Sequence, residues 1–270
     1  MKVPRTSIIR AIGSLTNMAK EMESKHLELR RITQVCSILL RAGLSPTCVS
    51  RTLVERCIEE QQKDGGWIAV SDTVWNLYFL KQLDHQLYKS QISDALSFLQ
   101  DQRNSHGLWG RSKRDIERVP VTGLLLHLLP ELADPDTLSL LEQLWRGERN
   151  GLTYKAAYTL LAFKRNGYQT RETSLIDNTV SWLMRNQRED GGYAPWKTHP
   201  VYSDVYCTAV ATLGLLQYTE LVSPQVLNLC LQWLEANQLP QGIWAFHEIE
   251  DGASWGLWAL VELSGHLGSS

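Results

Sequence analysis

The sequence predicts an all-α fold: a single (α/α)6 barrel, or toroid, of about twelve helices in an inner and an outer ring. Three observations predict it. A glycine followed by an aromatic residue recurs along the chain, the segments between these turns have the apolar spacing of helices, and two kinds of helix alternate. We expect one domain over residues 1–270, with an N-terminal hairpin at 1–45 and repeated units at 46–270.

The glycine-aromatic turn is the repeated unit. Successive turn glycines lie 42, 44, 40 and 51 residues apart, a period that indicates one supersecondary unit copied along the chain. A glutamine before the turn can bond the unpaired backbone groups of neighbouring helix ends, and the glycine permits a left-handed turn out of the helix. The glycines are Gly65, Gly107, Gly151, Gly191 and Gly242. The glutamines are Gln62, Gln102, Gln187 and Gln238, and the weakest copy, at residues 149–154, lacks one.

The helices that lead into the turns are expected to form the outer ring. Before the last turn, for example, apolar residues such as Val226, Cys230 and Leu234 recur every three or four positions with polar residues between them. Pro135 and Pro224 suit the first turns of such helices. The expected helices, in chain order, are residues 5–20, 25–43, 46–62, 72–84, 90–102, 119–130, 135–146, 153–165, 172–187, 204–217, 224–237 and 251–264.

The helices that follow the turns are expected to form the inner ring. Residues 73–80 and 208–216 are apolar nearly all round, so these helices must be buried on both faces. Asp72, Asp204 and Asp251 stand where helix-capping residues are expected. An open superhelix would leave a polar concave face, so a closed ring fits the inner helices better. Closure brings the starts of all inner helices to one end.

Composition and charge narrow the function. A net charge of −2 and a pI near 6.4 argue against nucleic-acid binding. The five cysteines are odd in number and have no ligand spacing, so we expect reduced thiols in a cytoplasmic protein. No signal-peptide pattern and no apolar stretch of about 20 residues is present, so a soluble protein is expected.

The turns resemble the QW motif, Q-x-x-D-G-G-W, of squalene and oxidosqualene cyclases, the squalene-hopene cyclase-like proteins, and related class II terpene cyclases. Residues 62–67 read QKDGGW, and residues 187–193 match except for Tyr193 in the last place. The protein prenyltransferase β subunits share this toroid and similar turns. The resemblance implies an α/α toroid, and it implies an isoprenoid as the apolar small-molecule substrate.

The segment at residues 204–209, DVYCTA, resembles the D-x-D-D-T-A segment of class II terpene cyclases, which protonate an alkene or epoxide with an aspartic acid. It departs from that pattern at Tyr206, in the place of the proton donor, and at Cys207. A phenol, with a pKa of about 10, is too weak for alkene protonation. Asp204 is therefore the candidate acid, if burial raises its pKa, and His199 the candidate proton partner. The alternative is that Asp204 only caps the helix.

An excess of ten tryptophans and nine tyrosines over four phenylalanines favours a lined cavity as much as a packed core. Aromatic faces attract cations, which suits a carbocation, although some of these rings must be plain core. Asp72 and Asp251 are expected at the mouth, where they can also be simple caps. The candidate substrate-binding residues are Trp75, Tyr158, Trp196, Tyr206, Cys207, Trp255, Trp258, Asp72 and Asp251.

No cofactor is expected. Mg²⁺ would enter with a diphosphate substrate, held by the carboxylates at the mouth, with the basic loop at residues 110–118 on the phosphates. A solvated charged loop is the plain alternative. A prenyltransferase-like zinc site would have to be improvised from Asp204, Cys207 and His247, so zinc is not expected.

Three functions follow. The leading hypothesis is a class II terpene-cyclase-like protein that cyclises or isomerises an isoprenoid by acid chemistry in an aromatic-lined cavity. The alternative is a non-catalytic toroid that binds an apolar ligand or a protein partner, which the replacements at Tyr206 and Cys207 support. A prenyltransferase β-subunit-like protein is the second alternative.

Overall fold

The computed structural model describes residues 6–148 and 151–267. Within these ranges the chain forms twelve α-helices and no strand, apart from an isolated bridge between Tyr193 and Asp204. The outer helices are α1 (Thr6–Ser24), α3 (Arg51–Glu59), α5 (Lys89–Asp101), α7 (Pro135–Glu148), α9 (Leu175–Asn186) and α11 (Pro224–Ala236). The inner helices are α2 (Leu29–Arg41), α4 (Val70–Asp84), α6 (Val119–Leu128), α8 (Thr153–Arg165), α10 (Val205–Leu215) and α12 (Ile249–Leu267).

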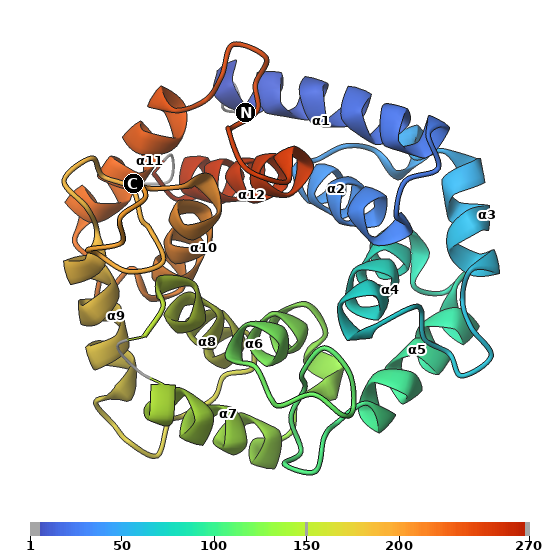
Figure 1. The fold of residues 1–270 in the computed structure, drawn as a ribbon, viewed down its shortest axis with the longest axis horizontal. Helices are drawn as coiled ribbons and strands as arrows, with labels where there is room; N and C mark the ends of the chain where they lie inside the picture. The colour runs from blue at the N-terminus through green and yellow to red at the C-terminus, as the bar shows by residue number, and fades with distance from the viewer. Residues whose placement is uncertain (1–5, 149–150, 268–270) are drawn as a thin grey trace.

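The helices form two concentric rings (Figure 1). Each inner helix packs against the next, and α12 packs against both α1 and α2, so the ring is closed. The predicted all-α toroid with inner and outer rings is confirmed. The first expected helix, residues 5–20, starts at a residue outside the described ranges and continues to Ser24.

Burial distinguishes the two rings as the sequence predicted. Ten of the eleven residues of α10 are buried, whereas α9 buries four of its twelve. Small residues allow the inner helices to approach closely. A Cβ atom on Gly214 of α10 would lie 2.8 Å from the Cα of Ala157 in α8, so this contact requires glycine.

The glycine-aromatic turns share one geometry. Gly65, Gly107, Gly191 and Gly242 have φ angles of 90°, 79°, 86° and 89°, the left-handed conformation that was expected. The tryptophan after the turn then reaches back to the preceding outer helix. The indole N–H groups of Trp67, Trp109 and Trp244 donate to the carbonyl oxygens of Cys57, Leu99 and Leu234, at 3.0, 2.6 and 2.8 Å.

In two turns the predicted glutamine, Gln187 or Gln238, joins two outer helices. The Nε2 of Gln187 donates to the oxygen of Gly191 in its own turn, at 2.9 Å, and to that of Val226 in α11, at 3.0 Å. Gln238 does the same with Gly242, at 3.0 Å, and with Ser7 of α1, at 2.9 Å. This last bond joins the final outer helix to the first.

The glutamine assignment was wrong in the other two turns. In the first turn, Gln61 and not Gln62 makes the bonds, to Gly65 at 2.7 Å and to Gln91 of α5 at 2.9 Å. The motif Q-x-x-D-G-G-W, counted back from the tryptophan, requires this position. In the second turn, Arg103 takes the place expected for Gln102 and donates to the Leu132 oxygen at 2.9 Å.

The weakest turn lies partly outside the described residues, at 149–150. Here a buried carboxylate joins the outer helices instead. Glu142 of α7 accepts hydrogen bonds from the backbone N–H groups of Arg171 and Glu172, at 2.9 and 3.1 Å, and from the Tyr168 hydroxyl, at 2.8 Å. These bonds hold residues 168–172 against α7, and helix α9 begins at Leu175 rather than at residue 172.

Candidate functional site

A pocket of about 160 Å³ lies at the end of the ring where the inner helices begin. Its lining is mainly apolar, with two phenols and one serine. The lining residues are Ser71, Val74 and Trp75 of α4, Pro120, Val121, Leu124 and Leu125 of α6, Tyr158 of α8, and Tyr206 of α10.

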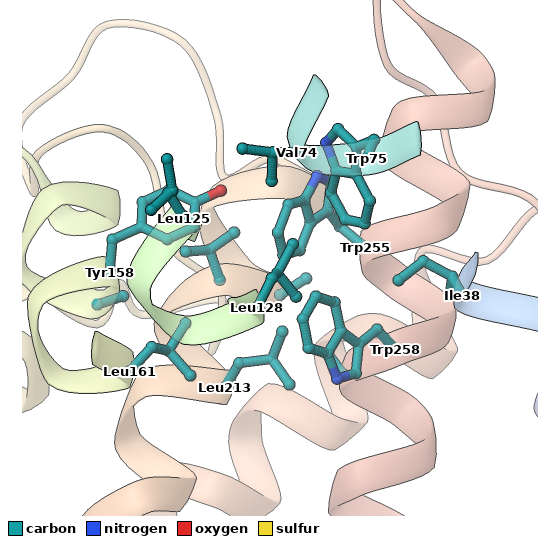
Figure 2. Packing of buried hydrophobic residues seen from close by; sticks show 14 of the residues in the cluster. Ile38, Val74, Trp75, Leu125, Leu128, Tyr158, Leu161, Leu213, Trp255 and Trp258 are labelled. Atoms are coloured by element: carbon teal, nitrogen blue, oxygen red, sulfur yellow. The ribbon is translucent and has the colours of Figure 1, made fainter. Parts of the chain in front are cut away.

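Five aromatic side chains form a continuous cluster, which begins in the pocket wall and extends behind it. The centre is Trp255 of α12, whose ring lies edge-on to Trp75 at 6.1 Å, to Tyr158 at 5.9 Å and to Tyr206 at 5.8 Å. Its other face stacks on Trp258 at 5.2 Å. Figure 2 shows the three indoles following one another among leucine side chains from several helices. The structure thus brings together five of the aromatic residues singled out in the sequence.

The two phenols of the pocket bond to each other. The hydroxyls of Tyr158 and Tyr206 are 3.0 Å apart. Burial raises the pKa of both groups well above the usual range of tyrosine, so both phenols are neutral. Tyr206 also packs against Tyr154 and stacks on Phe246, at 5.9 and 6.0 Å between ring centres. Tyr206 is therefore a hydrogen-bonding group and not an acid.

The far end of the cluster is closed by charged side chains that the sequence analysis missed. The Arg41 guanidinium lies 4.7 Å from the ring centre of Trp258 and donates to Glu262 at 2.9 Å. The ring of His127 lies 5.8 Å from that of Trp258, and burial lowers the pKa of His127 to about 4. Single polar residues on apolar helices have no spacing pattern that would reveal them.

Asp204 caps α10. Its Oδ1 accepts a hydrogen bond from the backbone N–H of Cys207 at 2.7 Å, so the capping interpretation describes its position. Burial raises the pKa of Asp204, although the bonds from Cys207 and the charge of His199 act in the opposite direction. His199 itself packs edge-on against Trp196, at 4.2 Å. Trp196 is 41% exposed, in the loop outside the aromatic cluster.

Asp251, in the first turn of α12, bonds directly to the aromatic cluster. Its Oδ1 accepts hydrogen bonds from the Nε2 of Gln34, at 2.5 Å, and from the indole N–H of Trp255, at 3.1 Å. Gln34 is buried, and its own Oε1 accepts from Arg30 at 3.2 Å. Burial raises the pKa of Asp251, opposed by Gln34 and by the Arg30 charge. Gln34 is a second residue that no sequence pattern revealed.

The remaining candidates lie around the mouth. Asp72 is half-buried in the first turn of α4, where burial raises its pKa and the charge of Arg30 opposes this. Cys207 is buried, and burial raises its pKa. In the basic loop, Arg118 is paired with Asp115 at 2.8 Å. Neither aspartate nor glutamate nor any cation is among the described residues that line the pocket.

Among the described residues, no group of three or more His, Cys, Asp or Glu side chains is placed to hold a metal ion. Asp72, Asp204 and Asp251 therefore do not gather into one cluster, and neither do Asp204, Cys207 and His247. In the described part of the chain, every helix is too short or too polar to cross a bilayer.

Comparison with solved structures identifies the fold. A variant of the type II terpene cyclase MstE from Scytonema, in complex with geranylgeranyl dihydroxybenzoate, superposes with a TM-score of 0.70 at 16% identity, over 96% of this chain and 99% of that one. The apo form of MstE gives a TM-score of 0.69 at 13% identity, over 97% and 100%. The ent-copalyl diphosphate synthase from Streptomyces platensis gives 0.59 at 14% identity, over 90% of this chain and 50% of that one.

No protein-family model matches the sequence, and no curated protein matches it. At these identities the structural likeness shows the fold. The chain has the toroid fold of the type II terpene cyclases, which the resemblance of its turns implied.

Proposed function

We propose that this protein binds an isoprenoid in the pocket between α4, α6, α8 and α10 and starts its cyclisation or isomerisation by protonating a double bond. The observation that carries the proposal is the pocket itself, an apolar recess with Trp75, Tyr158 and Tyr206 in its wall and Trp255 behind them. The pocket lies at the end of the ring where the inner helices begin, which is also the end that carries Asp204 and Asp251.

The chemistry requires one proton and a dry, aromatic surrounding. A neutral carboxyl transfers its proton to an alkene carbon, which leaves a carboxylate and a carbocation on the neighbouring carbon. The π electrons of a second alkene can then form a ring bond. Loss of a proton from an adjacent carbon to the carboxylate or to water ends the reaction, so an isomer of the substrate is formed. The faces of the aromatic cluster attract the cation in between.

Two carboxyls are candidates for the acid. Asp204 is the one that the sequence proposes, and burial raises its pKa. Burial also raises the pKa of Asp251, which accepts a hydrogen bond from the indole of Trp255 in the aromatic cluster. In both carboxyls, Oδ1 accepts a hydrogen bond from an uncharged N–H donor, so the acidic proton would be on Oδ2. His199, near Asp204, is the proposed proton partner of that carboxyl.

Substitution of each carboxyl tests the proposal. Purified protein is incubated with geranyl, farnesyl and geranylgeranyl substrates, as alcohols and as diphosphates, and with squalene, and the products are identified by mass spectrometry. We expect a cyclic or isomerised product, and a loss of about 100-fold or more in rate for Asp204→Asn or Asp251→Asn. Asp101→Asn, on the exposed end of α5, is the matched control. The absence of product from every substrate would remove the enzymatic proposal.

A second candidate function is a non-catalytic toroid that stores or carries an apolar ligand. The observation in its favour is that no carboxyl is among the described residues lining the pocket. In that case an isoprenoid would be recovered from purified protein by solvent extraction in about one equivalent. The same incubations would yield only unchanged substrate, and both Asp→Asn variants would bind it as the native protein does.

A further inference from the structure

We infer that the pocket selects a compact, neutral isoprenoid alcohol: an apolar group of about ten carbon atoms or fewer, carrying one oxygen that the paired hydroxyls of Tyr158 and Tyr206 receive. The inference rests on the proposed function, isoprenoid binding, and adds the size and polarity of the ligand. Three features of the pocket carry it.

The first feature is size. The pocket holds about 160 Å³, whereas sites for drug-sized ligands are commonly about 300–1,000 Å³. In another protein, an engineered apolar cavity of about 150 Å³ binds one benzene ring. A ligand of one ring or a short branched chain therefore fits this pocket. A twenty-carbon chain cannot lie wholly within the pocket without displacing side chains.

The second feature is that large, buried side chains form the back of the pocket and resist displacement by a ligand. Trp75 and Trp255 fill the axis of the ring directly behind the pocket, at 6.1 Å from each other. Trp255 is fixed by its bond to Asp251 and by stacking on Trp258, which Arg41 covers from the far end. Each of these rings is almost fully buried, and a close-packed interior resists movement of such large groups. The depth of the pocket is thus set by tryptophan side chains.

The third feature is an unused hydrogen-bond donor. The hydroxyls of Tyr158 and Tyr206 carry two protons, and their mutual bond uses one. Among the described residues, no acceptor is recorded for the other proton. A buried donor without an acceptor is unfavourable, so a ligand oxygen at this position is favoured over a hydrocarbon. Because burial keeps both phenols neutral, they remain donors across the working range of pH.

The oxygen must belong to a neutral group. No lysine, arginine or histidine lines the pocket among the described residues, and the rest of its wall is apolar apart from Ser71 at the rim. A diphosphate or carboxylate placed against the two phenols would be buried without a counter-charge, which is strongly unfavourable. An alcohol matches both the apolar wall and the single donor.

Equilibrium dialysis with a matched set of ligands tests the inference. The probes are geraniol with ten carbons, myrcene as a hydrocarbon of the same size, farnesol with fifteen carbons and geranylgeraniol with twenty. We expect geraniol to bind most tightly and to exceed myrcene by about five- to tenfold, the effect of one hydrogen bond. The double variant Tyr158→Phe/Tyr206→Phe is expected to abolish this preference, because each single variant still leaves one free hydroxyl donor. Tyr154→Phe is the control, because Tyr154 contacts Tyr206 without lining the pocket.

A wider pocket provides a second, independent measurement. Trp75→Leu removes an indole from the wall, and we expect this variant to bind farnesol at least tenfold more tightly than the native protein does. Its folding is checked by circular dichroism, and if it does not fold, the tyrosine variants still decide the question.

Two results would overturn the inference while leaving the proposed function intact: tighter binding of geranylgeraniol than of geraniol by the native protein, or an unchanged preference for geraniol over myrcene in the double Tyr→Phe variant. Binding of none of the four probes would also overturn the inference, and the proposed function would then stand or fall on the incubations with diphosphates and squalene.

Discussion

At the scale of single residues, Tyr193 differs from the aromatic residues of the other three full turns, because among the described groups no side-chain hydrogen bond joins it to the preceding outer helix. It occupies the place that tryptophan has in the other full turns, it is 0% exposed, and its hydroxyl has no partner among the described groups. The tryptophans donate to a carbonyl ten residues earlier. The unpaired hydroxyl of Tyr193 therefore lowers the stability of the fold, whereas the hydrogen-bonded indoles of the other turns do not.

Replacing these aromatic residues by phenylalanine should act in opposite directions. Tyr193→Phe removes an unsatisfied buried hydroxyl, so we expect an unchanged or higher stability, by up to about 1 kcal/mol. Trp109→Phe leaves the Leu99 oxygen without its donor and a void behind the ring, so a loss of about 2–4 kcal/mol is expected. Urea denaturation measures both. A destabilised Tyr193→Phe protein would mean that the hydroxyl has a partner after all.

The burial of Asp251 should make the stability of the protein depend on pH. Its pKa is raised in the folded protein, so the carboxylate destabilises the fold above the folded pKa, and this cost fades as pH falls toward the unfolded pKa of about 3.9. Asp251→Asn is expected to raise the melting temperature at pH 7 by about 2–4 °C, with a difference that shrinks toward pH 4. Thermal scans across this range measure it, and a difference independent of pH would contradict the assignment.

At the scale of elements, the sequence predicted the helices well and their connections less well. All twelve expected helices are present in the described chain, because amphipathic and fully apolar segments have distinct patterns. The start of α9 differed: residues 168–172 bond to Glu142 of α7, and the helix begins only at Leu175. The register of the first turn differed because Gln61 and Gln62 are adjacent; counting the motif back from Trp67 selects Gln61, which the structure shows bonded to α5.

That pair of glutamines offers a matched test of the turn. Gln61→Leu removes two hydrogen bonds and leaves the oxygens of Gly65 and Gln91 without this donor, so we expect a loss of about 1–3 kcal/mol. Gln62 is exposed, and Gln62→Leu is expected to change the free energy of unfolding by about 0.5 kcal/mol or less. Chemical denaturation of the two variants compares them directly, and equal effects would refute the assigned register.

Part of the candidate site was predictable from the positions of residues along the inner helices. Trp75, Tyr158 and Trp255 could be found because they lie near the starts of inner helices, where a closed ring must bring side chains together. Gln34 and Arg41 could not, since their partners, Asp251 and Glu262, lie more than 200 residues further along the chain. Only the closure of the ring makes them neighbours.

At the scale of the whole molecule, that closure depends on a polar seam between the first and last helices. Arg10 donates to Gln238 at 2.8 Å, and Gln238 donates to Ser7. Inside the ring, Arg31 pairs with Glu250, and Gln34 bonds to Asp251. A closed ring has no free end where unfolding can begin, so the seam is expected to protect α1.

Hydrogen exchange tests the seam. In native protein we expect the amides of α1 to be nearly as protected as those of α8, because both would exchange through global opening. Gln238→Leu is expected to increase exchange in α1 and α12 at least tenfold while that in α8 changes far less. Mass spectrometry of peptides from the exchanged protein follows each helix. Equal acceleration everywhere would show that the seam is not a separate unit.

The closed far end of the aromatic cluster has a kinetic consequence. Since Trp258 and Arg41 lie beyond Trp255, on the side away from the pocket, we expect a ligand to enter and leave by the same opening, at the starts of the inner helices. Entry and exit then compete for the same passage: a molecule cannot arrive until its predecessor has departed. We therefore expect any reaction product to inhibit competitively, and the residence time of that product to limit turnover once the chemistry is fast.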